Sequence, residues 1–165
     1  MSRRWLVTGV CAALLAGAVQ GATELAGSEA PDFVLKSVRG ENLRLSEYRG
    51  EIVMLAFWAT WCGDCRAQLE QLGQMQADYG GAGVELLAVS LDQTARQAER
   101  AAESLRVSHP VLHDAGGAVG RLYAVERMPS MVLIDRSGVV RDVFEGYTRG
   151  NEQQYLERVQ ALLRE

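Results

Sequence analysis

Two cysteines stand where a buried strand runs into a helix, and this junction constrains the fold more than any other feature of the sequence. Residues 52–57 (Ile-Val-Met-Leu-Ala-Phe) are continuously apolar, as in a strand covered on both faces. Cys62 and Cys65 follow shortly after this run. From Cys62 to about Tyr79 apolar residues recur at helical spacing, and Gly80-Gly81 ends the helix. A strand of this kind followed directly by a helix indicates an α/β fold.

The rest of the chain alternates strands and helices in a pattern that predicts a mixed sheet. Further strands are expected at residues 84–89, 111–112, 131–134 and 139–145, and further helices at 93–105, 118–123 and from 151 onward. Near the N-terminus, residues 30–35 and 43–45 flank a turn and form a β-hairpin. Right-handed crossovers make the first strands parallel, and the 131–145 hairpin adds an antiparallel edge. We therefore expect an α/β fold with a central mixed sheet, helices on both faces and an N-terminal β-hairpin extension.

The start of the chain has the layout of a signal peptide. A basic segment, Ser2-Arg3-Arg4, precedes an uncharged and mostly apolar run from Trp5 to Val19, and small residues follow for cleavage. The alternative is an uncleaved membrane anchor, but the apolar run is shorter than the roughly 20 residues that a spanning helix needs. We expect secretion, with a signal peptide at residues 1–21, a linker at 22–29 and one domain over 30–165.

The cysteine count indicates redox chemistry. Removal of the leader takes Cys11 away and leaves only Cys62 and Cys65. A secreted cysteine pair is usually structural, but a disulfide across so short a loop removes little chain entropy. The N-terminus of a helix carries unpaired N–H groups and positive potential, which stabilise a thiolate. Cys62, outermost in the first turn, is therefore the predicted nucleophile, and Cys65, one turn later, is predicted to resolve the mixed disulfide.

The sequence does not favour a metal site or a nucleic-acid surface. Structural metal sites usually need four ligands, and His109 and His113 have no ligand-like spacing to the single C-x-x-C unit. The net charge of −4 becomes −6 when the two leader arginines are removed, and the basic residues are scattered. We therefore expect no metal and no nucleic-acid partner.

Pro129 marks a second element of the site, just before the third apolar strand. Proline is tolerated at the first residue of a strand, although not in the middle of a central one. A cis Met128–Pro129 bond would bring backbone close to the cysteine pair. It would also offer an N–H and a C=O for pairing with a substrate strand.

These motifs together resemble those of the TlpA/ResA-like thioredoxins. The matching segments are Ala30-Pro31-Asp32-Phe33, Leu45 to Gly50, Phe57 to Cys65, Val89-Ser90-Leu91-Asp92 and Tyr123 to Asp135. The resemblance implies a thioredoxin fold, a periplasmic location and a redox-active Cys62–Cys65 disulfide with no other cofactor. It also implies that Cys62 is the nucleophile, Cys65 the resolving thiol and Pro129 the cis-proline.

The resemblance further implies a substrate class and a partner. Members of the family often reduce protein disulfides, for instance in apocytochrome c maturation, and a membrane electron donor of the DsbD or CcdA kind commonly re-reduces them. We therefore expect a protein-disulfide reductase that is a monomer and acts on a disulfide-containing protein. Its docking surface would include Trp61, Gly63, Asp64 and Met128.

Glu70 stands where the family often has proline, which leaves the kink of the active-site helix open. The proton acceptor for Cys65 is open too, because Ala56 stands where the family often has asparagine and thioredoxins a buried acid, and Gln93 stands where some members have a buried glutamate. Asp92 is the candidate acceptor, and its alternative role is to cap the next helix. Asp64, between the cysteines, opposes thiolate formation, and a less stable thiolate makes a less oxidising couple. The sequence therefore favours a reductant.

Three other functions stand as alternatives. A disulfide oxidase or isomerase would use the same fold and the same cysteines. A thiol-based metallochaperone or binding module would use the thiols as soft metal ligands. A peroxiredoxin usually has threonine three residues before its cysteine, where this chain has Ala59.

Overall fold

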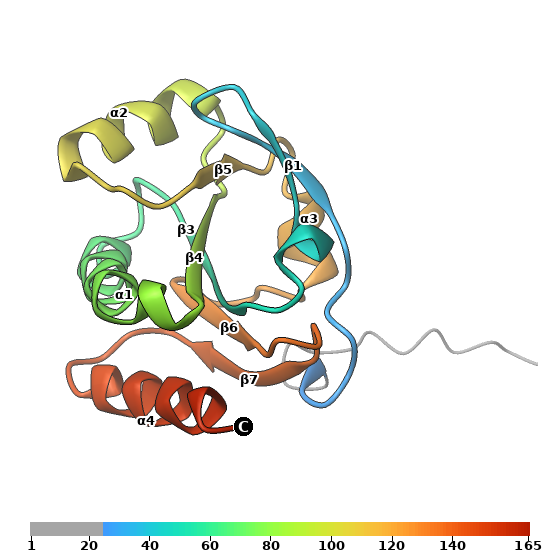
Figure 1. Ribbon diagram of the computed structural model, residues 1–165. Helices are drawn as coiled ribbons and strands as arrows, with labels where there is room; N and C mark the ends of the chain where they lie inside the picture. The colour runs from blue at the N-terminus through green and yellow to red at the C-terminus, as the bar shows by residue number, and fades with distance from the viewer. Residues whose placement is uncertain (1–24) are drawn as a thin grey trace, which may run out of the picture.

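The computed structural model describes residues 25–165 as a seven-stranded mixed sheet with helices on both faces (Figure 1). The strand order is β2-β1-β5-β4-β3-β6-β7. The strands are β1 (Val34–Ser37), β2 (Asn42–Arg44), β3 (Ile52–Trp58), β4 (Val84–Ser90), β5 (Val111–His113), β6 (Ser130–Ile134) and β7 (Val140–Glu145). The helices are α1 (Cys65–Tyr79), α2 (Ala95–Leu105), α3 (Ala118–Leu122) and α4 (Asn151–Leu163), with short 3-10 turns η2 (Leu45–Tyr48) and η3 (Gly80–Ala82). Within the described residues, none of these helices is both long and apolar enough to span a membrane.

The central strand is β3, in which every residue is buried. Its continuous apolar sequence makes burial on both faces favourable. β3 pairs in parallel with β4 on one side and antiparallel with β6 on the other. β4 in turn pairs in parallel with β5, and β6 pairs antiparallel with β7. The parallel centre and the antiparallel edge predicted from the order of the elements are both confirmed.

The two faces of the sheet have separate cores, because alternate residues of a strand point to opposite faces. The even-numbered residues of β3 pack with buried side chains of α1 and α4 and with Ala98 of α2. The odd-numbered residues pack with α3 and with the segment before β1. Figure 1 shows α1 and α4 on one side of the sheet and α3 on the other. The predicted covering of both faces is therefore confirmed.

The N-terminal hairpin extends the sheet beyond β5. β1 pairs antiparallel with β2 and, at its other edge, antiparallel with β5. Before the hairpin, Gly27 N–H donates to Val140 O, and Leu25 is buried. The chain thus packs on the domain from Leu25 onward, inside the stretch 22–29 that was expected to be a linker. The predicted signal peptide, residues 1–21, lies outside the described residues.

Two helices begin later than their sequence patterns suggest. α1 begins at Cys65 rather than at Cys62, because residues 60–64 are occupied largely by turns. α2 begins at Ala95 rather than at residue 93, and Thr94 forms a capping box with Gln97. Thr94, and not Asp92, is therefore the residue that caps α2.

Candidate active site

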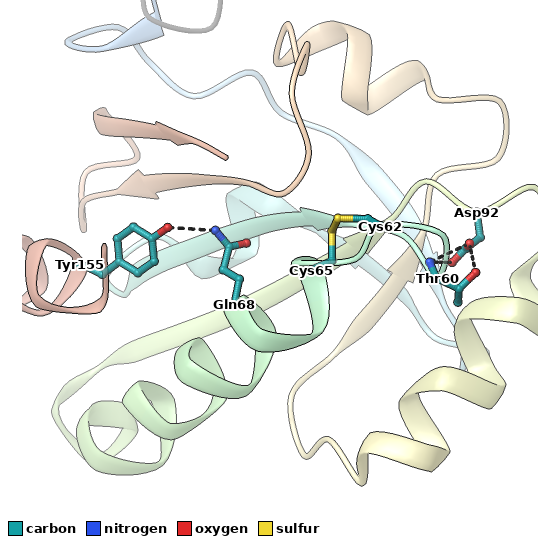
Figure 2. Close-up of a disulfide and its surroundings, with 6 residues drawn as sticks. All are labelled: Thr60, Cys62, Cys65, Gln68, Asp92 and Tyr155. Atoms are coloured by element: carbon teal, nitrogen blue, oxygen red, sulfur yellow. Dashed lines mark hydrogen bonds between the residues drawn. A yellow bond between two sulfur atoms is a disulfide. The ribbon is translucent and has the colours of Figure 1, made fainter. Parts of the chain in front are cut away.

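The cysteine pair lies at the carboxyl end of the central strand. β3 ends at Trp58 and α1 begins at Cys65, so Cys62 stands in the connecting loop and Cys65 is the first helical residue. The two form a disulfide with their Cα atoms 5.4 Å apart (Figure 2). Cys65 is 1% exposed, whereas Cys62 is half-buried. A partner protein can therefore reach Cys62 but not Cys65 without rearrangement.

The N-terminus of α1 provides the positive potential that a thiolate needs. Asp64 is the N-cap residue, but its side chain makes no capping bond within the described chain. The first N–H groups of a helix have no intrahelical partner, and the helix dipole adds positive potential there. Cys62 precedes the helix, whereas the sequence pattern predicts it in the first turn. The electrostatic argument still applies, because Cys62 is bonded to the first residue of the helix.

Asp92 fixes the loop that leads to the cysteines. Its carboxylate accepts hydrogen bonds from the backbone N–H of Thr60 at 3.0 Å and from Thr60 Oγ1 at 2.6 Å. Ser90 Oγ donates to the same carboxylate at 2.8 Å. Asp92 is 2% exposed, so these bonds satisfy a carboxylate that has little access to water. Asp92 thus ties the end of β4 to the loop before Cys62.

The placement of Asp92 bears on its predicted role as proton acceptor for Cys65. Both of its oxygens are engaged by Thr60 and Ser90. Figure 2 shows the pair formed by Thr60 and Asp92 on the Cys62 side of the disulfide. The contacts assign Asp92 a positioning role, and its role as acceptor stays a prediction.

Pro129 lies beside the cysteine loop through the pairing of β6 with β3. Ser130 pairs with Phe57, which places Pro129 level with Trp58 at the carboxyl end of β3. The Met128–Pro129 peptide bond is cis. Pro129 is buried, and its carbonyl accepts a hydrogen bond from Gly146 N–H at 2.7 Å. The Pro129 carbonyl is thus already engaged, and the pairing of a substrate strand with the backbone at this loop stays a prediction.

The residues predicted to form the docking surface differ in exposure. Trp61, next to Cys62, is 66% exposed and is one of the few large apolar side chains on the described surface. Gly63 and Asp64 belong to the same loop, and both are exposed. Met128 is partly buried and packs against both cores. Trp61, Gly63 and Asp64 thus surround Cys62 along the chain as an accessible surface.

Gln68 is a site residue that the sequence analysis missed. It lies on α1 one turn after Cys65, is fully buried, and its Nε2 donates to the Tyr155 hydroxyl of α4 at 3.0 Å. Figure 2 shows this pair on the opposite side of the disulfide from Asp92. Gln68 Oε1 has no hydrogen-bond partner among residues 25–165. Two signals in the sequence could have revealed Gln68. It lies three residues after Cys65, and it is next to Leu69 on the face of the helix that carries the apolar residues.

The two histidines differ in their contacts, because His113 has a hydrogen-bond partner and the buried Nε2 of His109 has none among residues 25–165. His113 Nε2 lies 2.9 Å from the Asp92 carbonyl oxygen. His109 is 3% exposed and packs next to Gly73 of α1. Within residues 25–165, no three His, Cys, Asp or Glu side chains come together as a metal ion would require.

Comparison with known sequences places the chain among redox proteins. Residues 26–143 match the AhpC/TSA family. The thiol-disulfide oxidoreductase ResA of Geobacillus thermodenitrificans is 36% identical over 134 residues, which are 81% of this chain and 77% of that protein. The ResA of Oceanobacillus iheyensis is 37% identical over 124 residues, which are 73% of this chain and 65% of that protein.

Solved structures show the same architecture. A Chlorobium tepidum protein described as a thiol:disulfide interchange protein DsbE superposes with a TM-score of 0.81 at 36% identity, covering 84% of this chain and 97% of its own. The exposed lipoprotein thioredoxin of Streptococcus pneumoniae superposes with a TM-score of 0.70 at 28% identity, covering 80% of this chain and 100% of its own. The expected thioredoxin fold is thereby confirmed. The cysteine pair at the helix start, the family match and the ResA relatives agree that this chain belongs to the AhpC/TSA family, in its TlpA/ResA-like thioredoxin branch.

Proposed function

We propose that this protein is a thiol–disulfide oxidoreductase that reduces disulfides in substrate proteins through Cys62 and Cys65. The observation that carries the proposal is the unequal burial of the two sulfur-bearing residues: Cys62 is half-buried and Cys65 is 1% exposed. Such a pair has one thiol that a protein can reach and one that acts only on its neighbour. The names of the relatives ResA and DsbE, which describe thiol–disulfide exchange, support the proposal.

The reaction consists of two consecutive exchanges. The Cys62 thiolate attacks one sulfur of the substrate disulfide, forms a mixed disulfide and displaces the other substrate sulfur as a thiolate, which takes up a proton. The Cys65 thiol gives up its proton and attacks Cys62 Sγ, which displaces the second substrate sulfur. Two electrons pass to the substrate, and the enzyme ends as the Cys62–Cys65 disulfide seen in the structure.

The direction of exchange follows from how well the site stabilises the Cys62 thiolate. The N-terminus of α1 favours the thiolate, whereas the exposed Asp64 carboxylate between the cysteines opposes it. A less stabilised thiolate makes the dithiol a better reductant. Asp64 therefore supports a reductase over an oxidase or isomerase on the same fold.

The proposal includes a location and an electron source. Residues 1–21 would direct the chain to the periplasm and be removed there, and the protein would act as a monomer. A membrane electron donor of the DsbD or CcdA kind would return the disulfide to the dithiol. Apocytochrome c, which needs reduced cysteines for haem attachment, is the example of a substrate that the ResA resemblance suggests.

Two alternatives have less support from the site. Ala59, which is 1% exposed, occupies the position where a peroxiredoxin usually has its threonine. For a metallochaperone, the described residues offer the two thiols without a third grouped Cys, His, Asp or Glu ligand. Metal analysis of the purified, reduced protein tests the metallochaperone alternative, because a metallochaperone would carry bound metal and a reductase would not.

Insulin reduction tests the proposed function. Wild type is expected to reduce insulin disulfides, Cys62→Ser to show only the background rate, and Cys65→Ser to accumulate a mixed disulfide with its substrate. The reduction potential of the pair is expected near the value of about −270 mV for thioredoxin rather than the value of about −120 mV for DsbA. Insulin reduction that survives Cys62→Ser would refute the mechanism, and a DsbA-like potential would refute the direction.

A further inference from the structure

A cavity of about 150 Å³ opens beside Cys62, between the loop after β3 and the C-terminal half of α2. Trp58 and Cys62 line it from one side, and Ala101, Ser104 and Leu105 of α2 line it from the other. It lies on the α2 side of the nucleophile, so it is distinct from the loop that carries Pro129. Its volume is comparable to that of a cavity that holds a benzene molecule.

The wall of this cavity is largely apolar. Trp58 is 3% exposed, and Ala101 and Leu105 are partly buried. The indole Nε1 of Trp58 is itself buried and has no hydrogen-bond partner among residues 25–165, so it presents no donor to the cavity. Arg66, the cation at the cavity, is already paired with Glu70 at 3.1 Å. The cavity therefore suits an apolar group better than an acidic one.

The cavity is held open by the contacts that fix the loop. Thr60 also lines it, and both the backbone N–H and the hydroxyl of Thr60 donate to the buried Asp92. A cavity whose wall is already ordered costs little conformational entropy to fill. The free energy gained by filling the cavity would therefore increase the affinity for a substrate, because the loop is already ordered and no free energy is needed to order it.

We propose that this cavity binds an apolar side chain of the substrate protein, next to the cysteine that Cys62 attacks. The inference rests on the proposed function, because Cys62 both lines the cavity and forms the mixed disulfide. A disulfide holds its two sulfur atoms about 2 Å apart, so the mixed disulfide brings the residues flanking the substrate cysteine within reach of the cavity. One leucine, methionine or phenylalanine side chain fits the volume, and its burial would favour substrates that carry such a residue there.

Two synthetic peptides test this selectivity. Each carries one cysteine as a mixed disulfide with thionitrobenzoate, and both neighbours of that cysteine are Leu in one peptide and Asn in the other. Attack by reduced Cys62 on the peptide sulfur forms the mixed disulfide and releases coloured thionitrobenzoate. Wild type is expected to react roughly tenfold faster with the Leu peptide, because part of a leucine side chain leaves water.

Paired variants on α2 assign the selectivity to the cavity. Ala101→Leu and Ser104→Phe fill it, and both are expected to bring the ratio of the Leu rate to the Asn rate close to one. Ser104 is exposed, so its substitution tests the cavity even where Ala101→Leu disturbs packing. Ala102→Leu and Glu103→Phe are matched controls, because these neighbouring residues line a different hollow with Val38 and Arg39. Both controls are expected to keep the wild-type ratio.

The outcomes separate this inference from the proposed function. Equal rates with the two peptides would overturn the cavity proposal and leave the reductase intact, as would a wild-type ratio in both Ala101→Leu and Ser104→Phe. Failure of wild type to release thionitrobenzoate from either peptide would overturn both. A high ratio that only the cavity-filling variants lose would establish the site.

Discussion

At the scale of single residues, the site depends on buried side chains that fix the position of the loop before Cys62. Asp92 is 2% exposed and joins Ser90 at the end of β4 to Thr60 before the cysteines. Its backbone carbonyl also contacts His113 of β5. Asp92 thus links two strands to the loop that presents Cys62. If Thr60 and Ser90 did not donate hydrogen bonds to it, the buried carboxylate would lack compensation for its lost contact with water.

Substitution of Asp92 by Asn tests this role. The amide keeps one acceptor but turns an NH2 group towards donors of Thr60 or Ser90, so at least one buried donor loses its partner. The free energy of unfolding is expected to fall by about 1–3 kcal/mol, as measured by urea denaturation. Gln93→Ala, at the exposed neighbouring position, is the control and is expected to change stability by less than about 0.5 kcal/mol. An unchanged stability in Asp92→Asn would contradict the positioning role.

The same variant decides whether Asp92 also accepts the proton of Cys65. Loss of a general base typically slows a reaction by about a hundredfold or more. Insulin reduction by the folded variant would show such a loss if Asp92 were the acceptor. A rate within a few-fold of wild type would leave Asp92 as a positioning residue only.

From the sequence, the chemical roles of these residues could be predicted better than the contacts that they make. Cys62 and Cys65 could be assigned because a lone C-x-x-C unit at a strand–helix junction suits thiol exchange and fits poorly with a metal site or a structural disulfide. Gln68 could not, because a polar residue on the inner stripe of a helix is identified only when its partner is known, and Tyr155 lies 87 positions away. Asp92 was recognised as a candidate, but its bonds to Thr60 depend on how β4 is placed beside β3.

At the scale of elements, α1 and α4 are joined by a polar contact inside an apolar interface. Gln68 of α1 donates to the hydroxyl of Tyr155, and both residues are fully buried. The Tyr155 ring also packs edge-on against Phe144 of β7, with ring centroids 4.8 Å apart. A hydrogen bond between two buried neutral groups orients the two helices without the desolvation cost of an ion pair.

Tyr155→Phe removes the hydroxyl and keeps the ring. Gln68 would then have neither end of its amide bonded within the described chain, so unfolding free energy is expected to fall by about 1–3 kcal/mol. Tyr79→Phe is the matched control, because the Tyr79 hydroxyl accepts a hydrogen bond from Gln160 in a partly buried site. The unfolding free energy is expected to fall clearly less in Tyr79→Phe than in Tyr155→Phe. The double variant Gln68→Leu/Tyr155→Phe removes both partners and is expected to recover part of the loss. Equal effects of the two tyrosine substitutions would contradict the buried contact.

The starts of the elements were less predictable than their existence. The strands and helices follow from apolar periodicity, which depends on burial and is visible in the sequence. The start of α1 depends instead on the turns between Thr60 and Asp64, and that of α2 on the capping box of Thr94 and Gln97. The first residue of a helix is set by local backbone geometry, and several neighbouring positions in the sequence can serve as that first residue.

At the scale of the whole molecule, stability depends on ionisable groups that folding buries. His109, before β5, is 3% exposed. Its burial, assisted by the nearby positive charge of Arg39, lowers the pKa of His109 to about 4 from its usual value of 6.5. The folded protein therefore keeps His109 neutral over a pH range in which the unfolded chain binds a proton there.

This difference predicts a dependence of global stability on pH. Between about pH 6.5 and about pH 4 the unfolded state binds more protons at this site, so its contribution to stability is complete above that window and is lost as the pH falls through it. The loss between about pH 7 and about pH 4 is expected to be on the order of 3 kcal/mol larger in wild type than in His109→Leu, measured by urea denaturation at each pH. Because the carboxylates titrate in both proteins, the comparison isolates the histidine. Equal losses would show that His109 gains a proton in the folded protein as readily as in the unfolded chain, so that the packing of His109 against α1 does not exclude charge.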